Sequence, residues 1–384
     1  MKIAFLTPEY PHPKTGTAGG IGTSIKNLSN GLLQLGHQVI VLVYRQKEDA
    51  VFIENGITFY QIKNVQCKGI SWWLTQKKIE RLINSLFHQQ KIDLVEAPDW
   101  TGITAMIQPK CPLVLKLHGS DTYFCYLDQR PVKSFNKFLE KRAFQKANAI
   151  ISVSAYTANI SQELFGSRNH ISVIPNGVDV ELFSKLSNIT ISEPAPIVLY
   201  FGTLIRKKGV LELPLIFNQL HQSHPKAQLW LVGKDSYDVQ TKITSTWQLM
   251  QPLFSASARQ QVVYKGATPY EQMQAIITQA AVCVFPTFAE ALPVSWLEAM
   301  AMQKAIVASD IGWAKEVITD GKEGYLVHPK KHQEFALKIL QLLDNKDLAT
   351  NFGIQAKEKI LQNYSSLQVA KRTIENYEKI LQST

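Results

Sequence analysis

Cysteine is scarce in this chain, which contains only Cys67, Cys111, Cys125 and Cys283 among its 384 residues. None of them stands in a Cys-x-x-Cys pair or close to paired histidines. The sequence therefore predicts neither a disulfide framework nor a zinc site. Cysteines without such a framework are typical of reducing compartments, and we expect a cytoplasmic protein.

Long apolar runs are missing as well. No stretch of the sequence approaches the roughly 18–20 apolar residues that a membrane-spanning helix needs. The four apolar residues Ile3–Leu6 are too few for the core of a secretion signal, so none is expected. We expect any contact with a membrane to be peripheral, on its cytoplasmic face.

Charge is moderate in amount but unbalanced in sign. Hydrophobic residues make up 45% of the chain and charged residues 19%, as in folded globular proteins, and the length favours two domains of roughly 150–200 residues. The formal net charge is +10, and residues 1–185 hold 21 basic and 14 acidic side chains. This excess permits attraction to phosphates or anionic lipids and also serves solubility. Because the sequence has no basic and aromatic nucleic-acid motif, nucleic-acid binding is disfavoured.

Short apolar runs alternate with longer amphipathic stretches in the first half. The segments Ile3–Leu6, Ile21–Leu35 and Val39–Tyr44 predict a strand, a helix and a second strand, with the strands buried and parallel. The other strands predicted in this half are Ile57–Ile62, Leu94–Glu96, Leu113–Leu117, Ile150–Val153 and Ile171–Ile174. The alternation predicts an α/β domain with a doubly wound parallel sheet.

The second half repeats this pattern after a polar stretch that contains Pro194 and Pro196. Its predicted strands are Val198–Phe201, Leu229–Val232, Val262–Tyr264, Val282–Phe285 and Ile306–Ala308. We expect a first domain over residues 1–185, a linker over 186–196 and a second domain over 197–366. We also expect the last helix, 367–384, to pack back on the first domain.

Two glutamates eight positions apart, Glu290 and Glu298, flank the start of a predicted helix. Pro293 suits the first helical turn, because its fixed φ and missing N–H cost little there. The free N–H groups of such a turn favour a phosphate. Glutamates beside this turn suit sugar hydroxyls, and a solvated helix surface is the structural alternative.

A glycine cluster, Gly19-Gly20-Ile21-Gly22, lies between the first strand and the first helix. Its small residues let backbone N–H groups approach a ligand, and a tight turn is the structural alternative. A dinucleotide fingerprint needs another glycine at the position of Ile25 and an acidic residue at the end of the second strand, where Tyr44 and Arg45 stand. NAD binding is therefore disfavoured.

Polar residues also follow two other strands of the first half. His118 comes directly after Leu113–Leu117, at the carboxyl edge where open α/β sheets hold ligands. A histidine at this position suits either a role in catalysis or a structural hydrogen bond. Glu96 and Asp99 follow Leu94 and suit acceptor-side or structural roles better than a matched acid–base pair.

Three adjacent cations, Arg206, Lys207 and Lys208, follow the strand Val198–Phe201. Arginine offers phosphate oxygens a bidentate fork and lysine a point charge, and both neutralise a departing phosphate group. The segment predicts a diphosphate site, and a solvated loop is the alternative.

Three motifs resemble the retaining glycosyltransferases of family 4. They are Ile174-Pro-Asn-Gly-Val-Asp179, Glu290-x7-Glu298-Ala-Met-Ala, and the segment from Gly312 through Glu316 to Gly324-Tyr-Leu-Val. The match runs in order from Gly20 to Val327. The resemblance implies the α/β fold called GT-B, in which two Rossmann-like, doubly wound parallel-sheet domains face a central cleft and the C-terminal one holds most of a nucleotide-sugar donor.

The resemblance also implies roles for single residues. Glu290 would contact the hydroxyls of the donor sugar and Glu298 the ribose, while the amides of Leu292 and Val294 would approach the phosphates. The catalytic residues expected in this way are His118, Arg206, Lys208 and Glu290, and the expected donor-binding residues are Gly20, Gly22, Gly202, Leu292, Val294 and Glu298.

Two positions depart from the family pattern. Thr203 follows Gly202 where the family often has arginine, so either Arg206 or Lys207 is expected to take that place. Ala291-Leu292-Pro293 stands where the family usually has Gly-Phe-Gly, which predicts a bulkier wall beside the donor and a shifted sugar preference.

The expected activity is transfer of a sugar from a nucleotide diphosphate sugar to a hydroxyl of a lipid-linked or carbohydrate acceptor, with retention of anomeric configuration and without a metal or other cofactor. Glycolipid, lipopolysaccharide or polysaccharide biosynthesis is the expected context. Two interpretations compete with it: a catalytically inactive subunit that binds a nucleotide sugar, and a glycoside hydrolase that uses Glu290 and Glu298 as its carboxylate pair. A cationic loop and a phosphate-binding helix start serve no purpose in hydrolysis, which favours transfer.

Overall fold

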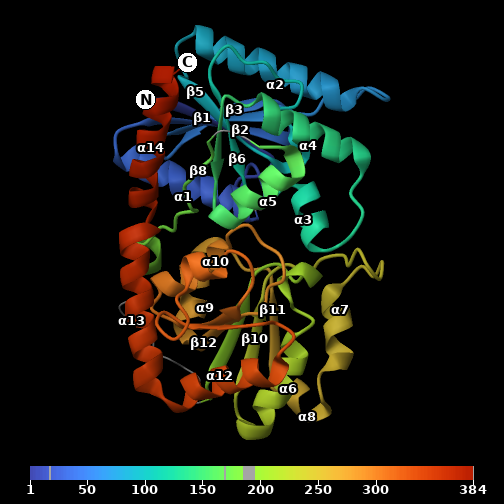
Figure 1. Cartoon of the computed structure of the whole chain (residues 1–384), viewed down its shortest axis with the longest axis vertical. Coiled ribbons are helices and arrows are strands. Elements are labelled where there is room, and N and C mark those ends of the chain that lie inside the picture. Colours follow the sequence, from blue (N-terminus) through green and yellow to red (C-terminus); the bar gives the residue numbers. More distant parts are fainter. Residues whose placement is uncertain (17–18, 168–169, 185–194, 384) are drawn as a thin grey trace. The chain divides into compact units, whose positions relative to one another are not determined.

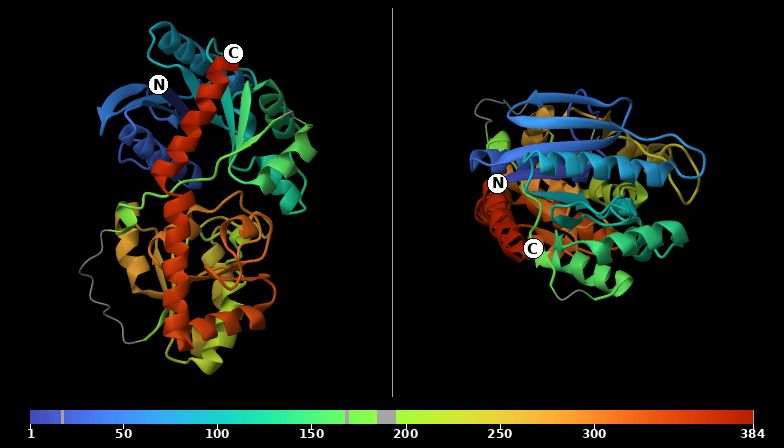
Figure 2. Two further views of the ribbon diagram at one scale, coloured as in Figure 1. Left: turned by 60° about the vertical axis from the view of Figure 1, so that its left-hand side comes forward. Right: turned by 90° about the horizontal axis from the view of Figure 1, so that it is seen from above.

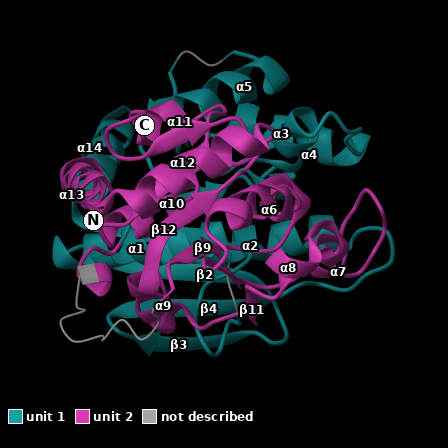
Figure 3. Ribbon diagram, turned by 90° about the horizontal axis from the view of Figure 1, so that it is seen from below, with its two compact units in different colours: residues 1–178, 364–384 teal, residues 179–363 magenta. Residues whose placement is uncertain are grey.

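The computed structural model describes residues 1–16, 19–167, 170–184 and 195–383. It divides the chain into two compact units, coloured teal and magenta in Figure 3. Unit 1 comprises Met1–Val178 and Tyr364–Thr384, and unit 2 comprises Asp179–Asn363. The boundary expected at residue 185 and most of the linker expected over 186–196 lie outside the described residues. The change of unit comes earlier in the chain, after Val178.

Unit 1 is built on an eight-stranded sheet with the order β3-β4-β2-β1-β5-β6-β7-β8 (Figure 1). The strands are β1 (Lys2–Thr7), β2 (Gln38–Gln46), β3 (Ala50–Glu54), β4 (Ile57–Lys63), β5 (Leu94–Pro98), β6 (Leu113–Leu117), β7 (Ala149–Ser152) and β8 (Ser172–Val173). Neighbouring strands are parallel except β3, which pairs with β4 in antiparallel fashion. The central strands are buried along their whole length, as expected when helices cover both faces of a parallel sheet.

Helices cover both faces of this sheet. They are α1 (Gly20–Gln34), α2 (Ser71–His88), α3 (Asp121–Leu127), α4 (Ser134–Lys146), α5 (Ala155–Phe165) and α14 (Ser366–Ser383). Ile3 and Phe5 of β1 belong to the core that α1 and α14 build on one face. Ala4 and Leu6 point to the opposite face, where α2 packs. Successive side chains of the strand thus supply two different cores.

Of the hairpin of β3 and β4, the predicted strands include β4 but not β3. Asn55 and Gly56 form its two-residue turn, with φ values of 50° and 78°. An Asn-Gly pair suits such a turn because both positions require a positive φ. β3 was not predicted although Ala50–Ile53 is a continuous apolar run, and none of its five residues is buried at this edge of the sheet.

The last helix, α14, belongs to unit 1 although it is far from the rest of that unit in sequence. It lies beside α1 in both ribbon views (Figure 1; Figure 2). Close approach depends on Gly31 of α1, because a Cβ at that position would collide with the carbonyl oxygen of Ser366. The Tyr377 hydroxyl of α14 donates a 2.7 Å hydrogen bond to buried Glu96 of β5, which fixes the helix against the sheet.

The chain leaves unit 1 and re-enters it at neighbouring points. The N–H of Val178 donates to the carbonyl oxygen of Tyr364 at 2.9 Å, and the N–H of Ser366 donates back to the oxygen of Val178 at 2.9 Å. Val178 also forms a parallel bridge with Ser365. Unit 2 is therefore inserted into unit 1 between two hydrogen-bonded segments.

Unit 2 is built on a six-stranded, wholly parallel sheet with the order β11-β10-β9-β12-β13-β14. The strands are β9 (Ile197–Phe201), β10 (Gln228–Val232), β11 (Val262–Gly266), β12 (Ala280–Phe285), β13 (Ala305–Ser309) and β14 (Tyr325–Val327). The helices are α6 (Leu213–Ser223), α7 (Thr246–Met250), α8 (Ala256–Arg259), α9 (Met273–Gln279), α10 (Val294–Ala301), α11 (Ala314–Val317), α12 (His332–Asp344) and α13 (Lys346–Asn363). The predicted α/β class with two parallel-sheet domains is confirmed.

The order of strands in unit 2 reverses direction at one place. From β9 the chain proceeds to β10 and β11 on one side of the sheet, and from β12 it proceeds to β13 and β14 on the other. The point between β9 and β12 is a topological switch point, where loops leave the carboxyl edge in opposite directions and ligands of open α/β sheets bind.

Among the described residues no helix is both long enough and apolar enough to cross a membrane.

Candidate functional site

The loops that follow β9 and β12 lie together at this switch point. The N–H groups of Phe288 and Ala289, in the loop after β12, both donate to the carbonyl oxygen of Lys207 in the loop after β9, at 2.9 and 3.1 Å. The two segments that the sequence singles out, the cationic loop and the Glu290 segment, are thus joined through their backbones. Strand order explains this proximity, because β9 and β12 are neighbours in the sheet although about 80 residues separate them in the chain.

Glycine is required where the two loops touch. Gly209 has a φ of 67°, and a Cβ at that position would collide with the carbonyl oxygen of Pro286. Gly202, with a φ of 143°, lies where a Cβ would stand 3.5 Å from the Lys208 amine. The absence of a side chain at Gly209 lets the two loops approach each other, and the positive φ of Gly202 favours glycine directly after β9.

Lys208 and Glu290 form the centre of the site. The Nζ atom of Lys208 lies 2.9 Å from Oε1 of Glu290, and the two side chains are 22% and 16% exposed. Burial disfavours the ionised form of Glu290, but the charges of Lys208 and Lys207 outweigh it and hold the pKa of this carboxyl below its ordinary value. A carboxylate and an ammonium group therefore meet at a position that solvent, and hence a ligand, can still reach.

The start of α10 follows this ion pair directly. Pro293 is the N-cap residue, with φ −74° and ψ 121°, and Val294 is the first helical residue. The proline thus lies one position outside the helix rather than in the first turn where we expected it. The N–H of Trp296 donates to the carbonyl oxygen of Pro293 at 3.3 Å, and the helix dipole makes this end of α10 attractive to an anion. Leu292 and Val294, on either side of the proline, are both nearly buried.

Glu298 lies one turn further along α10 and is 5% exposed. Burial raises the pKa of its carboxyl to about 7, although a hydrogen bond from the Tyr270 side chain and the charge of Lys208 act in the opposite direction. Near neutral pH this carboxyl is present in both protonation states, so it can donate as well as accept hydrogen bonds. The two glutamates of the motif therefore have different chemistry.

Arg206 forms an ion pair with a carboxylate that was not predicted from the sequence. Its Nε and Nη2 atoms donate to the two oxygens of buried Asp238 at 2.8 and 2.9 Å. The hydrogen bond from Arg206 and those from Thr241 lower the pKa of Asp238 to about 2. Because a guanidinium carries five N–H groups, this pairing fixes the orientation of Arg206 without using all of its donors. Nothing in the local sequence around Asp238, which lies in the loop after β10, indicates this contact.

In unit 1, His118 follows β6 as predicted, and its backbone N–H donates to Oδ1 of Asp99 at 3.0 Å. Burial and the charge of Lys116 lower the pKa of His118 to about 3, so the imidazole is neutral near pH 7. Burial also raises the pKa of Asp99 to about 7. His118 is therefore a neutral hydrogen-bonding group at the carboxyl edge of this sheet, rather than a cation.

Gly20 and Gly22 lie at the start of α1, also in unit 1. The N–H of Gly22 donates to Oε1 of Glu9 at 3.2 Å. A side chain of the protein itself thus occupies one of the amides that we expected to approach a ligand. Gly20 is exposed and has open space where a Cβ would be.

Unit 2 thus brings together most of the predicted residues, and three others lie in unit 1. Those near the switch point of unit 2 are Gly202, Arg206, Lys208, Glu290, Leu292, Val294 and Glu298, whereas Gly20, Gly22 and His118 belong to unit 1. The partners Asp238, Tyr270 and Glu9 were not predicted, because tertiary folding alone brings them to the motif residues. Within the described part of the chain, no group of three or more His, Cys, Asp or Glu side chains is arranged to hold a metal ion.

Two family models match the chain in succession. The model described as Glycosyltransferase Family 4 matches residues 18–182, and the one described as Glycosyl transferases group 1 matches residues 185–359. The first match falls largely on unit 1 and the second on unit 2, where the candidate site lies.

Characterised relatives match over nearly the whole chain at low identity. Alpha-maltose-1-phosphate synthase of Mycolicibacterium smegmatis is 26% identical, with 99% of this chain and 100% of that protein covered. Glycogen synthase of Mycobacterium tuberculosis is 23% identical, with 98% of this chain and 94% of that protein covered.

Solved structures share the fold. Sucrose-phosphate synthase from Thermosynechococcus elongatus superimposes with a TM-score of 0.82 at 19% identity, with both chains covered completely. HepE from Anabaena, solved in complex with UDP and glucose, superimposes with a TM-score of 0.76 at 18% identity, with 99% of this chain and 100% of that chain covered. The arrangement of two parallel-sheet domains is therefore that of GT-B proteins.

Proposed function

Because the chain belongs to the glycosyltransferases, with a family 4 domain followed by a group 1 domain, we propose that it moves a hexosyl unit from a uridine diphosphate sugar to an acceptor hydroxyl with retention of anomeric configuration. Structures similar to it were solved with UDP, with UDP and glucose, and with UDP-glucose, which supports uridine as the donor base.

The observation that carries the proposal is the Lys208–Glu290 pair at the start of α10. A diphosphate placed there meets the Lys208 ammonium and the positive end of the dipole of α10. Both stabilise the negative charge that grows on the diphosphate as the bond to the sugar breaks. This arrangement supplies what a metal ion supplies elsewhere, so we propose that transfer is metal-independent.

Glu290 is proposed to hold the transferred sugar. Its lowered pKa keeps it ionised at neutral pH, and an ionised carboxylate accepts hydrogen bonds from two hydroxyls. Glu298, deeper in α10, is proposed to bind the two ribose hydroxyls. A carboxyl with a pKa of about 7 can pair with hydroxyls in either protonation state.

The second positive charge at the diphosphate is proposed to come from Lys207 rather than Arg206. Lys207 acts on Glu290 electrostatically, whereas two donors of Arg206 are held by Asp238. Arg206 then serves to fix the shape of the cationic loop. His118, neutral near pH 7, is proposed to donate a hydrogen bond to the transferred sugar.

The acceptor is proposed to be a carbohydrate, free or linked to a lipid, in glycolipid, lipopolysaccharide or polysaccharide biosynthesis. The names of the relatives describe carbohydrate products, namely maltose 1-phosphate, glycogen and sucrose phosphate. The replacement of Gly-Phe-Gly by Ala291-Leu292-Pro293 beside the donor is expected to alter which sugar is preferred.

The testing experiment measures nucleotide release from UDP-, GDP- and ADP-sugars with carbohydrate acceptors and with a membrane lipid extract, in the presence of a chelator. We expect UDP release that requires an acceptor, and a product whose anomeric configuration in proton NMR is that of the donor. An inverted product would overturn retention, and loss of activity with the chelator would overturn metal independence.

Two variants connect this activity to the site. Glu290→Gln preserves the shape of the side chain but removes its charge, and it should reduce transfer by about a hundredfold or more. Glu334→Gln, an exposed glutamate on α12, should leave transfer unchanged. Nucleotide binding without turnover would favour the non-enzymatic subunit, and sugar release without nucleotide would favour the hydrolase.

A further inference from the structure

The positive charge of the chain is concentrated in unit 1. That unit contains 23 basic and 14 acidic side chains, whereas unit 2 contains 18 and 17, so the units differ by eight in net charge. Attraction to phosphate-bearing donors does not explain this difference, because the cationic loop lies in unit 2. The excess in unit 1 indicates a separate anionic partner.

Two short segments of unit 1 account for most of its excess. Residues 64–81, which lead into α2, contain four basic side chains and one acidic one, and residues 133–146, which include α4, contain five and one. Together they hold a net charge of +7 out of the +9 of the unit. The charge is therefore local rather than spread over the surface for solubility.

The helices α2 and α4 present these cations together with aromatic side chains. The buried residues of α2 include Ile79 and Ile83, which leaves Trp73, Lys77 and Arg81 on the outer side at a spacing of four residues. On α4, Lys137, Phe138 and Lys141 are exposed while Leu139 and Ala143 are buried. We call these six outward residues the α2–α4 face.

The two halves of this face are joined by an aromatic contact. Trp72 of α2 and Phe135 of α4 pack edge to face, with ring centroids 5.1 Å apart. The two helices also lie next to one another in Figure 1. The cations of both segments therefore act on the same region of the surface.

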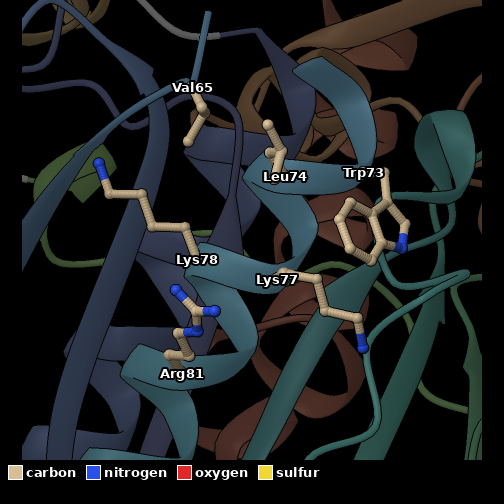
Figure 4. A pocket seen from close by; sticks show the side chains of 6 residues that line it. All are labelled: Val65, Trp73, Leu74, Lys77, Lys78 and Arg81. Carbon is tan, nitrogen blue, oxygen red and sulfur yellow. The ribbon is translucent and has the colours of Figure 1, made fainter. Parts of the chain in front are cut away.

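A depression of about 510 Å³ lies beside the α2 part of the face. Figure 4 shows Lys78 and Arg81 on one side of it and Trp73 and Lys77 on the other, with Leu74 and Val65 above. Cationic groups thus surround an apolar hollow, which is the chemistry of a site for the headgroup and upper acyl chain of an anionic lipid.

Exposed aromatic residues are unusually concentrated here. Among the described residues, the aromatic side chains exposed by more than a third are Trp73, Tyr126, Phe135, Phe138 and Tyr237, and all except Tyr237 come from α2, α3 or α4. Ile70, just before α2, is 48% exposed as well. Apolar side chains with this exposure are costly in water unless a partner covers them.

The acidic residues near the face neutralise only part of its charge. Glu140 of α4 is buried and accepts hydrogen bonds from the N–H groups of Asp121 and Thr122 at 2.9 and 3.0 Å. Glu80 pairs with Lys77 at 2.9 Å and Asp49 pairs with Lys78 at 2.6 Å, whereas within the described part of the chain Arg81, Lys137 and Lys141 form no ion pair. Burial together with Arg142 and Lys77 lowers the pKa of Lys146, a sign that cations from both helices repel one another.

We propose that the α2–α4 face binds the surface of an anionic phospholipid bilayer. Lysine and arginine side chains lie at the level of the phosphates, and Trp73 and Phe138 enter the interface beneath them. A bilayer accounts for both observations at once, because it offers negative charge and apolar depth side by side. The sequence predicts a peripheral membrane contact, and the α2–α4 face is the surface that we propose for it. This proposal does not depend on the proposed transfer reaction.

The experiment measures co-sedimentation of the full chain with vesicles. We expect binding to vesicles of equal parts phosphatidylglycerol and phosphatidylcholine at low salt, weaker binding at high salt, and little binding to pure phosphatidylcholine. The double variant Lys137→Glu/Lys141→Glu and the double variant Trp73→Ser/Phe138→Ser should each reduce the partition coefficient by at least about tenfold.

Matched variants on the same unit serve as controls. Lys371→Glu/Lys379→Glu changes the net charge equally on the exposed side of α14, and Val51→Ser/Ile53→Ser removes exposed apolar side chains from the edge strand β3. Both should bind vesicles as the parent does. The proposal is overturned if the controls lose as much binding as the face variants, if phosphatidylcholine binds equally well, or if the chain binds heparin but not anionic vesicles.

Discussion

At the scale of single residues, the ion pair of Lys208 and Glu290 separates two functions that both depend on charge. The ammonium group is suited to the diphosphate and the carboxylate to the sugar, so each can be removed without the other. A neutral replacement of one residue removes one charge and leaves the other in place, so the effects on donor binding and on turnover can be measured separately.

Replacing Lys208 by glutamine should weaken UDP binding about ten- to a hundredfold, because a charge-assisted hydrogen bond to a phosphate contributes about 1.5–3 kcal/mol. Isothermal titration with UDP measures this directly. Lys226→Gln, which removes an exposed lysine at the opposite edge of the sheet just before β10, should leave the dissociation constant as it is. Equal affinities for parent and Lys208→Gln would contradict the role of the cationic loop.

Glu298 should make the stability of unit 2 depend on pH. Its pKa is raised by burial to about 7, above the value of 4.5 for an unperturbed glutamate, so the folded state retains a proton that the unfolded state has lost. The contribution of this carboxyl to stability is therefore greatest below pH 4.5 and falls as the pH rises to about 7, by about 3 kcal/mol. Glu298→Gln should abolish this decline, as measured by urea unfolding at several pH values.

The control for this titration is another carboxyl with a raised pKa. Asp99 of unit 1 also has a pKa of about 7, again because of burial. Asp99→Asn should change the pH dependence of the transition of unit 1 and leave the contribution of Glu298 in place. A pH profile that is identical for parent and Glu298→Gln would show that this carboxyl ionises normally.

At the scale of elements, the strands with continuous apolar runs are the part of the fold that the sequence predicts well. Strands β6 and β12 are buried along almost their whole length, and such runs have few alternatives to a central position in a parallel sheet. The edge strands β3 and β14 were not among the predicted strands, although Ala50–Ile53 and Tyr325–Val327 are apolar, because periodicity alone does not assign apolar runs of three or four residues to a strand. The Asn55-Gly56 pair, which was not used for the prediction, is a local sequence signal for the β3–β4 hairpin.

Only part of the candidate site could be predicted from the sequence. Residues that belong to one continuous motif, such as Glu290, Pro293 and Glu298, could be interpreted from spacing, because a helix start fixes their relation. Asp238 and Tyr270 could not, since they reach Arg206 and Glu298 only when β10 and the segment before α9 take their places beside the switch point. Physical contact between distant segments leaves no local pattern.

Because the two loops of the site are in contact at Gly209, we expect replacement of this glycine to have a large effect. Gly209→Ala should weaken both folding and UDP binding, because alanine must adopt a positive φ and its Cβ meets the Pro286 carbonyl. Gly321→Ala is a matched control, since Gly321 has a φ of 76° but open space around the missing Cβ. The control should lose only about 1–2 kcal/mol of stability, the cost of the backbone conformation.

Thermal unfolding combined with UDP titration tests this pair of variants. The loss in Gly209→Ala should exceed that in Gly321→Ala, and only Gly209→Ala should bind UDP more weakly. Equal losses in both would mean that the loops rearrange without cost to the site.

At the scale of the whole molecule, the helix α14 determines which unit depends on the C-terminus. Its residues Val369, Ile374 and Tyr377 belong to the core of unit 1, and Tyr377 holds the buried carboxylate of Glu96. A chain that ends at Asn363 should therefore lose the cooperative unfolding of unit 1 while unit 2 retains its own transition and its affinity for UDP. Calorimetry of the truncated and full chains distinguishes the two transitions.

A single substitution refines this prediction. Tyr377→Phe removes only the hydroxyl, so it should destabilise unit 1 by about 1–3 kcal/mol, the cost of leaving a buried carboxylate without its donor. If the thermal unfolding transition of unit 1 were unchanged after removal of the whole helix, α14 would not be part of its core.

The paired hydrogen bonds of Val178 with Tyr364 and Ser366 have a practical consequence for dividing the protein. Because hydrogen-bonded neighbouring segments lie roughly 5 Å apart, a bridge of about 4–6 glycine and serine residues can join Val178 directly to Tyr364. The excised portion, Asp179–Asn363, is already one uninterrupted polypeptide. We therefore expect each unit to be expressible as a separate protein, unit 2 for titration with nucleotides and the rejoined unit 1 for measurements on vesicles.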